Sequence, residues 1–204
     1  MPEITEITTQ KNNADRCNLF VDGVFCCGLL KETAFKYSLK KGLTVSEEEL
    51  KKIIEDDKIK QAFSVALSYV AKALKTKRQV KDYLLKKGYD DELSWKCVDK
   101  LKEYGYVDDV EYSKRYIESV GDKYGRKLIE FKLMQKGVRK DDICAAYDAV
   151  GIREVNPAVE VAKKYLRNKE KTKENISKTY RYLVGKGFSY DEINDCMSIL
   201  GEDE

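Results

Sequence analysis

The chain has 204 residues and a formal net charge of +3; 37% of its residues are charged and 42% are hydrophobic. This apolar content is high enough for a packed core, so the composition excludes a disordered chain. The net charge is too small to indicate a polyanion partner by itself. The sequence contains no histidine, which excludes serine–histidine triads and most zinc sites. Two prolines and twelve glycines are few, and their scarcity favours long helices.

The cysteines and the hydropathy pattern indicate a compartment. None of the six cysteines forms a C-x-x-C pair, and reduced thiols in a cytoplasmic protein are the simplest interpretation. The first residues do not resemble a signal peptide, and no apolar run is long enough to suggest a transmembrane helix. We therefore expect a cytoplasmic protein without a membrane partner.

The N-terminal segment predicts a small β-structure. The run DRCNLFVDGVFCCGLL alternates polar and apolar residues on both sides of Asp22-Gly23, a pair that favours a tight hairpin turn. We predict strands over Arg16–Val21 and Val24–Leu29.

Two helix signals follow this hairpin. A short helix is predicted over Lys31–Lys40. The sequence Ser46-Glu47-Glu48-Glu49 then forms a capping box, which opens a further helix. Residues 1–57 are thus expected to combine a β-hairpin with helices.

From about Lys58 onward the chain repeats itself. The phrases LLKKGYDDEL, LMQKGVRKDDI and LVGKGFSYDEI follow one another at intervals of about 50 residues. Each repeat is predicted to contain three helices. The first helices are predicted over Lys58–Lys75, Asp109–Asp122 and Pro157–Lys169, the second over Lys77–Lys87, Arg126–Lys136 and Lys173–Lys186, and the third over Asp91–Tyr104, Asp141–Val150 and Tyr190–Leu200.

A glycine marks the end of each second helix. Gly88, Gly137 and Gly187 stand where a left-handed residue terminates a helix. Four residues before each glycine stands a leucine, which indicates the inward face of the helix. A three-helix unit of this size buries little apolar surface alone, so neighbouring repeats are expected to stack.

The predicted fold class is all-α: tandem three-helix repeats that form an elongated, curved solenoid, with a small N-terminal β-hairpin and short helices. The predicted domains are residues 1–57 for the N-terminal part and residues 58–105, 106–151 and 152–204 for the first, second and third repeats.

Motifs for catalysis are missing from the sequence, and we expect neither enzymatic activity nor a cofactor or metal. The densest acidic cluster, GYVDDVEY, contains Asp108 and Asp109, which could hold magnesium as paired carboxylates do in nucleases. No third carboxylate or base stands at a matching spacing. A helix cap followed by a negative first turn is therefore the preferred interpretation.

The second helices are basic, whereas the third helices are acidic. Three basic runs in register predict a binding surface for phosphates or for an acidic protein groove, although a solvated helix surface is the alternative for any one run. The fourteen tyrosines could stack on bases, but their periodic positions favour packing. The candidate binding residues are Lys77, Arg78, Lys81, Arg126, Lys127, Lys132, Lys136, Arg139, Lys164, Arg167, Lys178 and Arg181.

The segment from Leu101 to Ile143 resembles the central signature of the RecX regulatory proteins. The run ALSYVAKALKTKRQVKDYLLKKGY resembles the first repeat of that family, and the Asp22-Gly23 hairpin resembles the N-terminal extension of its members from Gram-positive bacteria. The third repeat matches least well. The matching residues are Leu101, Gly105 to Asp109, Tyr112, Gly125, Ile129, Leu133 and Lys136 to Val138, with Thr76, Val80, Leu84 and Leu85 in the first repeat.

The resemblance implies a non-enzymatic modulator of the recombinase RecA in DNA repair and recombination. Such a protein is expected to lie in the groove of the RecA–DNA filament and to suppress its ATPase, strand-exchange and coprotease activities. It implies a monomer that contacts single- or double-stranded DNA weakly or through RecA. The resemblance assigns no individual binding residue, so the candidates rest on charge. The alternatives are a free-standing nucleic-acid-binding repeat protein and a metal-dependent enzyme that uses Asp108 and Asp109.

Overall fold

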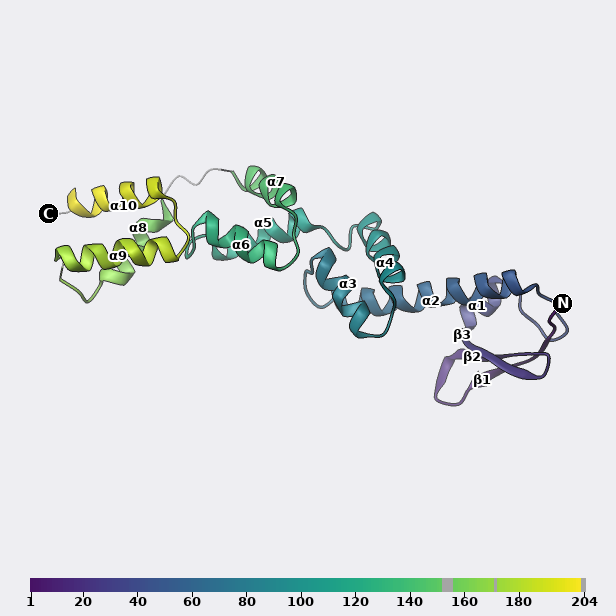
Figure 1. The fold of residues 1–204 in the computed structure, drawn as a ribbon. Helices are drawn as coiled ribbons and strands as arrows, with labels where there is room; N and C mark the ends of the chain where they lie inside the picture. Colours follow the sequence, from purple (N-terminus) through teal and green to yellow (C-terminus); the bar gives the residue numbers. More distant parts are fainter. Residues whose placement is uncertain (152–155, 171, 203–204) are drawn as a thin grey trace. The chain divides into compact units, whose positions relative to one another are not determined.

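A computed structural model describes residues 1–151, 156–170 and 172–202 of the chain (Figure 1). The chain divides into two compact units. The first comprises residues 1–72 and 83–103, and the second comprises residues 73–82 and 104–204. The division falls within helix α3 (Lys77–Lys86).

The N-terminal sheet has three antiparallel strands, β1 (Ile4–Gln10), β2 (Asn13–Val21) and β3 (Val24–Leu30), in the order β1-β2-β3. The predicted hairpin is confirmed. Its turn residues Asp22 and Gly23 both have positive φ, at 50° and 80°, as a two-residue turn between twisted strands requires. The prediction missed β1, and a three-stranded sheet replaces the simple hairpin.

Two helices follow the sheet, and both differ from their predictions. Helix α1 spans Lys31–Lys36 and is shorter than predicted, because Ser38 has a φ of 50°. Helix α2 spans Glu47–Val70 and begins at the predicted capping box. A separate helix starting at Lys58 was therefore a wrong prediction. The 24-residue helix contains neither glycine nor proline, so nothing in its sequence stops it.

A buried carboxylate links α2 to the sheet in the first unit. Asp57 is almost fully buried, and its carboxylate accepts a 2.9 Å hydrogen bond from the backbone N–H of Leu30, where β3 ends. Residues from the inner face of the sheet, together with Val45 and α2, form an apolar core around this carboxylate. That core contains Ile4, Cys17, Leu19, Leu29, Val45 and Ile53. Helix α4 (Asp91–Glu103) packs against α2.

The repeats contain three helices each, as predicted, and most helix ends fall within about four residues of their predicted positions. The second repeat consists of α5 (Asp109–Val120), α6 (Arg126–Gln135) and α7 (Lys140–Val150). The third consists of α8 (Pro157–Leu166), α9 (Lys173–Gly185) and α10 (Tyr190–Glu202). Each encloses its own apolar cluster, centred on Leu133 in one and on Leu183 in the other.

The glycines that end the second helices have the predicted conformation. Gly88, Gly137 and Gly187 have φ values of 89°, 82° and 85°. This left-handed backbone costs little only for glycine, which explains the residue at these three positions.

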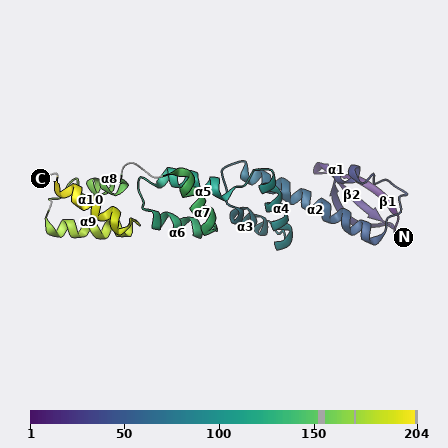
Figure 2. The same ribbon diagram turned by 90° about the horizontal axis from the view of Figure 1, so that it is seen from above.

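The second helices of repeats 2 and 3 meet end to end, as Figures 1 and 2 show. The backbone N–H of Gly125 donates to the carbonyl of Lys186 at 3.0 Å, and that of Lys127 donates to the carbonyl of Gly187 at 3.2 Å. The amino end of α6 thereby supplies donors to the carbonyl end of α9, so the two helix dipoles align head to tail. We call this junction the α6–α9 seam.

A similar junction, also within the second unit, joins the start of α3 to the end of α6. The hydroxyl of Thr76, which precedes α3, donates to the carbonyl of Lys136 at 2.8 Å. A Cβ added to Gly137 would lie 2.5 Å from side-chain carbons of Arg78. The terminal glycine of a second helix therefore serves two purposes: it permits the left-handed stop, and it leaves room for the helix of the preceding repeat.

Candidate functional site

The paired aspartates of the GYVDD motif cap helices. The carboxylate of Asp108 accepts hydrogen bonds from the backbone N–H groups of Val110 (2.8 Å) and Glu111 (3.2 Å), as the N-cap of α5. Asp109 is buried, and it accepts a 2.9 Å hydrogen bond from the backbone N–H of Lys77 at the start of α3. Among the described residues no group of three or more potential ligands could hold a metal ion. The arrangement supports the cap interpretation over the magnesium site.

Asp109 provides a test of this structural role. Asp109→Ala should lower the free energy of unfolding by about 2–3 kcal/mol, because it leaves the Lys77 N–H without its buried acceptor. Asp109→Asn keeps an acceptor oxygen and should cost less. Burial raises the pKa of the Asp109 carboxyl, against the opposing influence of Lys77. The folded state therefore holds this proton more tightly than the unfolded state does.

The sign of the pH dependence follows from that raised pKa. Stability from Asp109 should fall as pH rises from the unfolded-state value of 3.8 through the folded-state pKa. Denaturant titrations of wild type and Asp109→Asn across this range measure the difference. A difference that grows in the opposite direction would contradict burial as the dominant influence on this carboxyl.

The predicted basic residues differ in the partners that their side chains contact. Five of them have carboxylate partners within the chain, namely Lys77 with Asp109 and Asp142, Arg78 with Asp82, Arg126 with Glu130, Arg139 with Asp142, and Lys178 with Glu174. The remaining candidates lie on several helices, at Lys81, Lys127, Lys164, Arg167 and Arg181. Arg181 bonds Ser177 on its own helix. Lys132 and Lys136, one turn apart on and just after α6, both lie beside tyrosine rings.

Tyrosines from α5 and from the connection that follows it contact lysines at the ends of the second helices. The ammonium nitrogen of Lys132 lies 3.8 Å from the ring centroid of Tyr124, and that of Lys136 lies 5.9 Å from the ring of Tyr116. The ammonium nitrogen of Lys186, the C-cap of α9, lies 5.0 Å from the centroid of the same Tyr124 ring, so two ammonium groups share one ring. Cation–π attraction holds each nitrogen near its ring.

The same pattern continues into the third repeat. Lys186 also lies 5.2 Å from the ring of Tyr182, which stacks on Tyr165 at 4.3 Å between centroids. Lys169 lies 3.2 Å from the ring of Tyr165. The contacts from Lys132 to Lys169 join into one chain that crosses the α6–α9 seam, and the pair of Lys136 and Tyr116 lies one helical turn beyond Lys132. We call it the lysine–tyrosine ribbon, and it consists of Lys132, Lys136, Lys169, Lys186, Tyr116, Tyr124, Tyr165 and Tyr182.

The ribbon lysines differ in their partners from the five paired candidates. In the part of the chain that the structure describes, none of the four ribbon ammonium groups lies within ion-pair distance of a carboxylate. By contrast, Arg126 and Arg139 are both paired with acids of their own repeat. The four lysines therefore present positive charge that a partner could neutralise.

Charge runs alone did not identify six of the eight ribbon residues. Lys169 and Lys186 were not among the sequence candidates, and the tyrosines were assigned to packing. A signal was present, because Tyr69, Tyr116 and Tyr165 recur in the first helices at nearly the repeat spacing. Tyr69 stacks on Tyr83 in the first unit, at 4.0 Å between centroids. The ribbon rings are half-buried, and each of them also lies beside an ammonium group.

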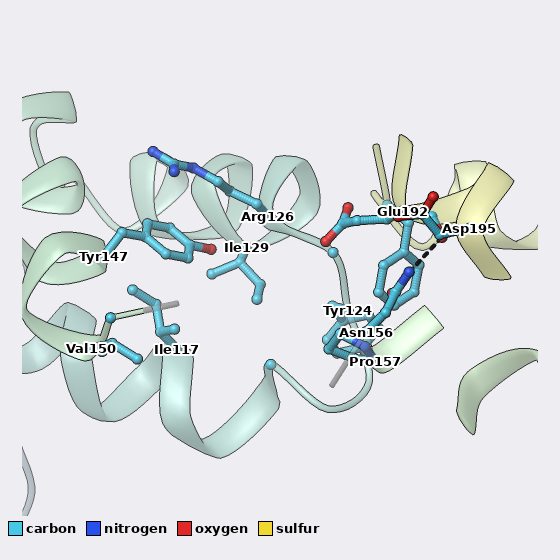
Figure 3. A pocket seen from close by; sticks show the side chains of 14 residues that line it. Ile117, Tyr124, Arg126, Ile129, Tyr147, Val150, Asn156, Pro157, Glu192 and Asp195 are labelled. Carbon is cyan, nitrogen blue, oxygen red and sulfur yellow. Dashed lines mark hydrogen bonds between the residues drawn. The ribbon is translucent and has the colours of Figure 1, made fainter. Parts of the chain in front are cut away.

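An open cavity of about 380 Å³ lies beside the α6–α9 seam (Figure 3). Arg126 and Tyr147 line one side of it, with the guanidinium carbon 4.4 Å from the ring centroid. The opposite side is formed by the third repeat, where the side-chain amide of Asn156 donates to the carbonyl of Glu192 at 2.7 Å. The cavity shows that the two repeats are incompletely packed at this side of the seam.

These features define a class of protein: a protein of tandem three-helix repeats in which lysines lie against tyrosine rings. Three family models match the chain: the regulatory protein RecX N-terminal domain over residues 2–46, the RecX first three-helix domain over 62–101, and the RecX third three-helix domain over 158–197. The chain belongs to the RecX family of regulatory proteins. No helix among the described residues is both long and apolar enough to cross a membrane.

Curated relatives support this membership along the whole chain. The chain is 35% identical to the regulatory protein RecX of Clostridium botulinum (strain Alaska E43 / Type E3), over 97% of this chain and 95% of that protein. It is 32% identical to the same-named protein of Clostridium perfringens (strain SM101 / Type A), over 100% and 99%. It is also 32% identical to that of Bacillus licheniformis, over 97% and 77%.

Solved structures share the fold. A crystal structure of regulatory protein RecX superposes with a TM-score of 0.75 at 23% identity, over 97% of this chain and 100% of that one. A crystal structure of RecX from Lactobacillus salivarius gives a TM-score of 0.63 at 24% identity, over 72% and 98%. The predicted class of helical repeats with a small N-terminal β-structure is thereby confirmed.

Proposed function

We propose that this protein binds the filament that RecA forms on DNA and inhibits its ATPase, strand-exchange and coprotease activities. It acts by binding, without catalytic chemistry, as a monomer in the cytoplasm. Membership of a family of regulatory proteins supports the regulatory role. The lysine–tyrosine ribbon supports a binding mechanism most directly, because its four lysines span two adjacent repeats and have no carboxylate partner among the described residues.

The ribbon suits a partner that is itself extended and repetitive. A filament presents the same acidic or phosphate-bearing surface at regular intervals, and successive repeats of this chain can meet successive sites. Binding through several weak contacts in a row gives high avidity only when all of them engage together. Each repeat, over residues 58–105, 106–151 and 152–204, is proposed to act as one contact module of this row.

The test measures RecA activity directly. Added protein should lower the ATPase rate of RecA on single-stranded DNA by about five-fold or more at saturation, the range of ordinary allosteric coupling. A pull-down with RecA, with and without single-stranded DNA, should show stronger capture when the filament is present. Tight DNA binding without any effect on RecA would instead support a free-standing nucleic-acid-binding protein.

A further inference from the structure

Tyr124 lies at the α6–α9 seam and contacts a lysine from each side of it. Lys132 belongs to α6, at 3.8 Å from the ring centroid, and Lys186 caps α9, at 5.0 Å. The two ammonium nitrogens are therefore at most about 9 Å apart. The next residue after Tyr124 is Gly125, whose N–H forms a hydrogen bond of the seam itself.

The two charges repel each other across the seam. In the described residues neither ammonium has a carboxylate partner, and Coulomb repulsion between partly exposed like charges at this distance is modest but unfavourable. The ring attracts both nitrogens, yet it carries no net charge. An anion placed between the two lysines would convert this repulsion into attraction on both sides.

Few contacts hold the seam together, so an anion bound there can change the stability of the seam. Two backbone hydrogen bonds join α6 to the C-terminal end of α9, and the cavity of about 380 Å³ lies beside them, lined by both repeats (Figure 3). An interface with a cavity of this size has fewer apolar contacts than a close-packed core. Its stability is therefore sensitive to a bound ligand.

We propose that Lys132, Tyr124 and Lys186 form a phosphate clamp across the α6–α9 seam. Its ligand is the phosphodiester backbone of a nucleic acid strand, and a bound phosphate stabilises the docking of repeat 3 on repeat 2. The two lysines contact the phosphate, and Tyr124 is a positioning residue that orders both of them. The inference rests on the proposed function only for the source of the nucleic acid strand, because the RecA filament contains a DNA strand.

The residue types favour phosphate over carboxylate as the ligand. Arginine matches carboxylates with two parallel hydrogen bonds, and in this chain Arg126 and Arg139 already pair with carboxylates. Lysine acts as a compact point charge and suits a phosphate oxygen from any direction. The ribbon also continues to Lys136 on one side and Lys169 on the other, as a linear polyanion requires.

Binding is tested with oligothymidylate and with a DNA duplex of the same length, at several salt concentrations and without RecA. Lys132→Gln and Lys186→Gln should each weaken binding about five- to ten-fold and lower the log–log salt slope by about 0.7. Tyr124→Leu should weaken binding similarly, whereas Tyr124→Phe should restore it because the ring remains. Lys123→Gln, which removes a neighbouring exposed charge outside the ribbon, should change affinity by less than about two-fold.

The coupling to the seam is measured by amide hydrogen exchange. The N–H groups of Gly125 and Lys127 form the seam, so their exchange should slow several-fold when oligothymidylate is added to the wild type. In the double variant Lys132→Gln/Lys186→Gln this protection should be lost at the same fraction bound. Circular dichroism of each variant confirms that the helices remain.

Three outcomes overturn the inference. The clamp is wrong if the double variant binds oligothymidylate as tightly as wild type, and its coupling is wrong if binding leaves Gly125 and Lys127 unprotected. If poly-glutamate binds as tightly as oligothymidylate, with the same loss in the variants, the partner is an acidic protein surface instead. Failure of wild-type protein to inhibit RecA overturns the proposed function alone, since none of these measurements contains RecA.

Discussion

Replacement of Gly125 by alanine should undock repeat 3 from repeat 2. A Cβ at this position would lie 2.2 Å from the carbonyl oxygen of Gly187 and 2.3 Å from the backbone nitrogen of Phe188. These are backbone atoms, which cannot move aside as a flexible side chain does. Overpacking and the loss of two backbone hydrogen bonds together predict destabilisation of the seam by about 3 kcal/mol or more.

The strain in this variant is steric and not conformational. Gly125 has a φ of −75°, which any residue adopts, so alanine is excluded there only by the approach of α9. The expected result is that α8, α9 and α10 lose amide protection at lower denaturant concentration than α5 to α7. Hydrogen exchange at increasing denaturant measures this separation.

Gly185 provides the matched control. It lies within α9, has no atom within 4 Å of an added Cβ, and has an ordinary helical backbone. Gly185→Ala should therefore stabilise the chain by about 0.5–1 kcal/mol, because alanine has the higher helix propensity. An unchanged unfolding profile for Gly125→Ala, beside a stabilised Gly185→Ala, would show that the close approach at the seam does not limit stability.

Helix positions in the repeats were predictable because their signals are local. Gly137 and Gly187 end their helices through a backbone conformation that glycine alone adopts cheaply, and Asn156 caps α8 with its own side chain. The continuation of α2 through Lys58 was not predicted, since the repeat pattern suggested a boundary that no stop residue supports. Strand β1 was missed because its alternation is weak and its partner strand supplies its order.

The candidate site was less predictable, because it depends on contacts between distant residues. Lys132 and Lys186 are 54 positions apart in the sequence and meet at Tyr124 only through the seam. Conversely, Arg126 and Lys132 belong to one basic run, yet Arg126 pairs with Glu130 and lies over Tyr147 instead. A count of charges along a helix cannot separate a paired cation from one without a carboxylate partner. The fold makes that distinction for five of the twelve sequence candidates, which have carboxylate partners, and it places two others, Lys132 and Lys136, in the ribbon.

Reversal of three ribbon charges should abolish inhibition of RecA. The variant Lys132→Glu/Lys136→Glu/Lys186→Glu replaces attraction for a polyanionic or acidic partner with repulsion. The concentration needed for half-inhibition of the ATPase should rise on the order of 100-fold at low salt. Wild-type inhibition should itself weaken as salt rises towards physiological concentration, since screening and counterion release act on the same charges.

The matched control reverses three exposed lysines outside the ribbon, Lys72, Lys102 and Lys123, so that both variants have the same net charge. Loss of the cation–π contacts should cost the ribbon variant about 0.5–1 kcal/mol for each lysine, which leaves its circular dichroism unchanged at moderate temperature. If the control loses inhibition equally, RecA senses net charge and not position. If the ribbon variant inhibits as well as wild type, the contact surface lies elsewhere, and the acidic helices α7 and α10 are then the next surface to reverse, because the other predicted cations of repeat 2 are already largely neutralised by their own acids.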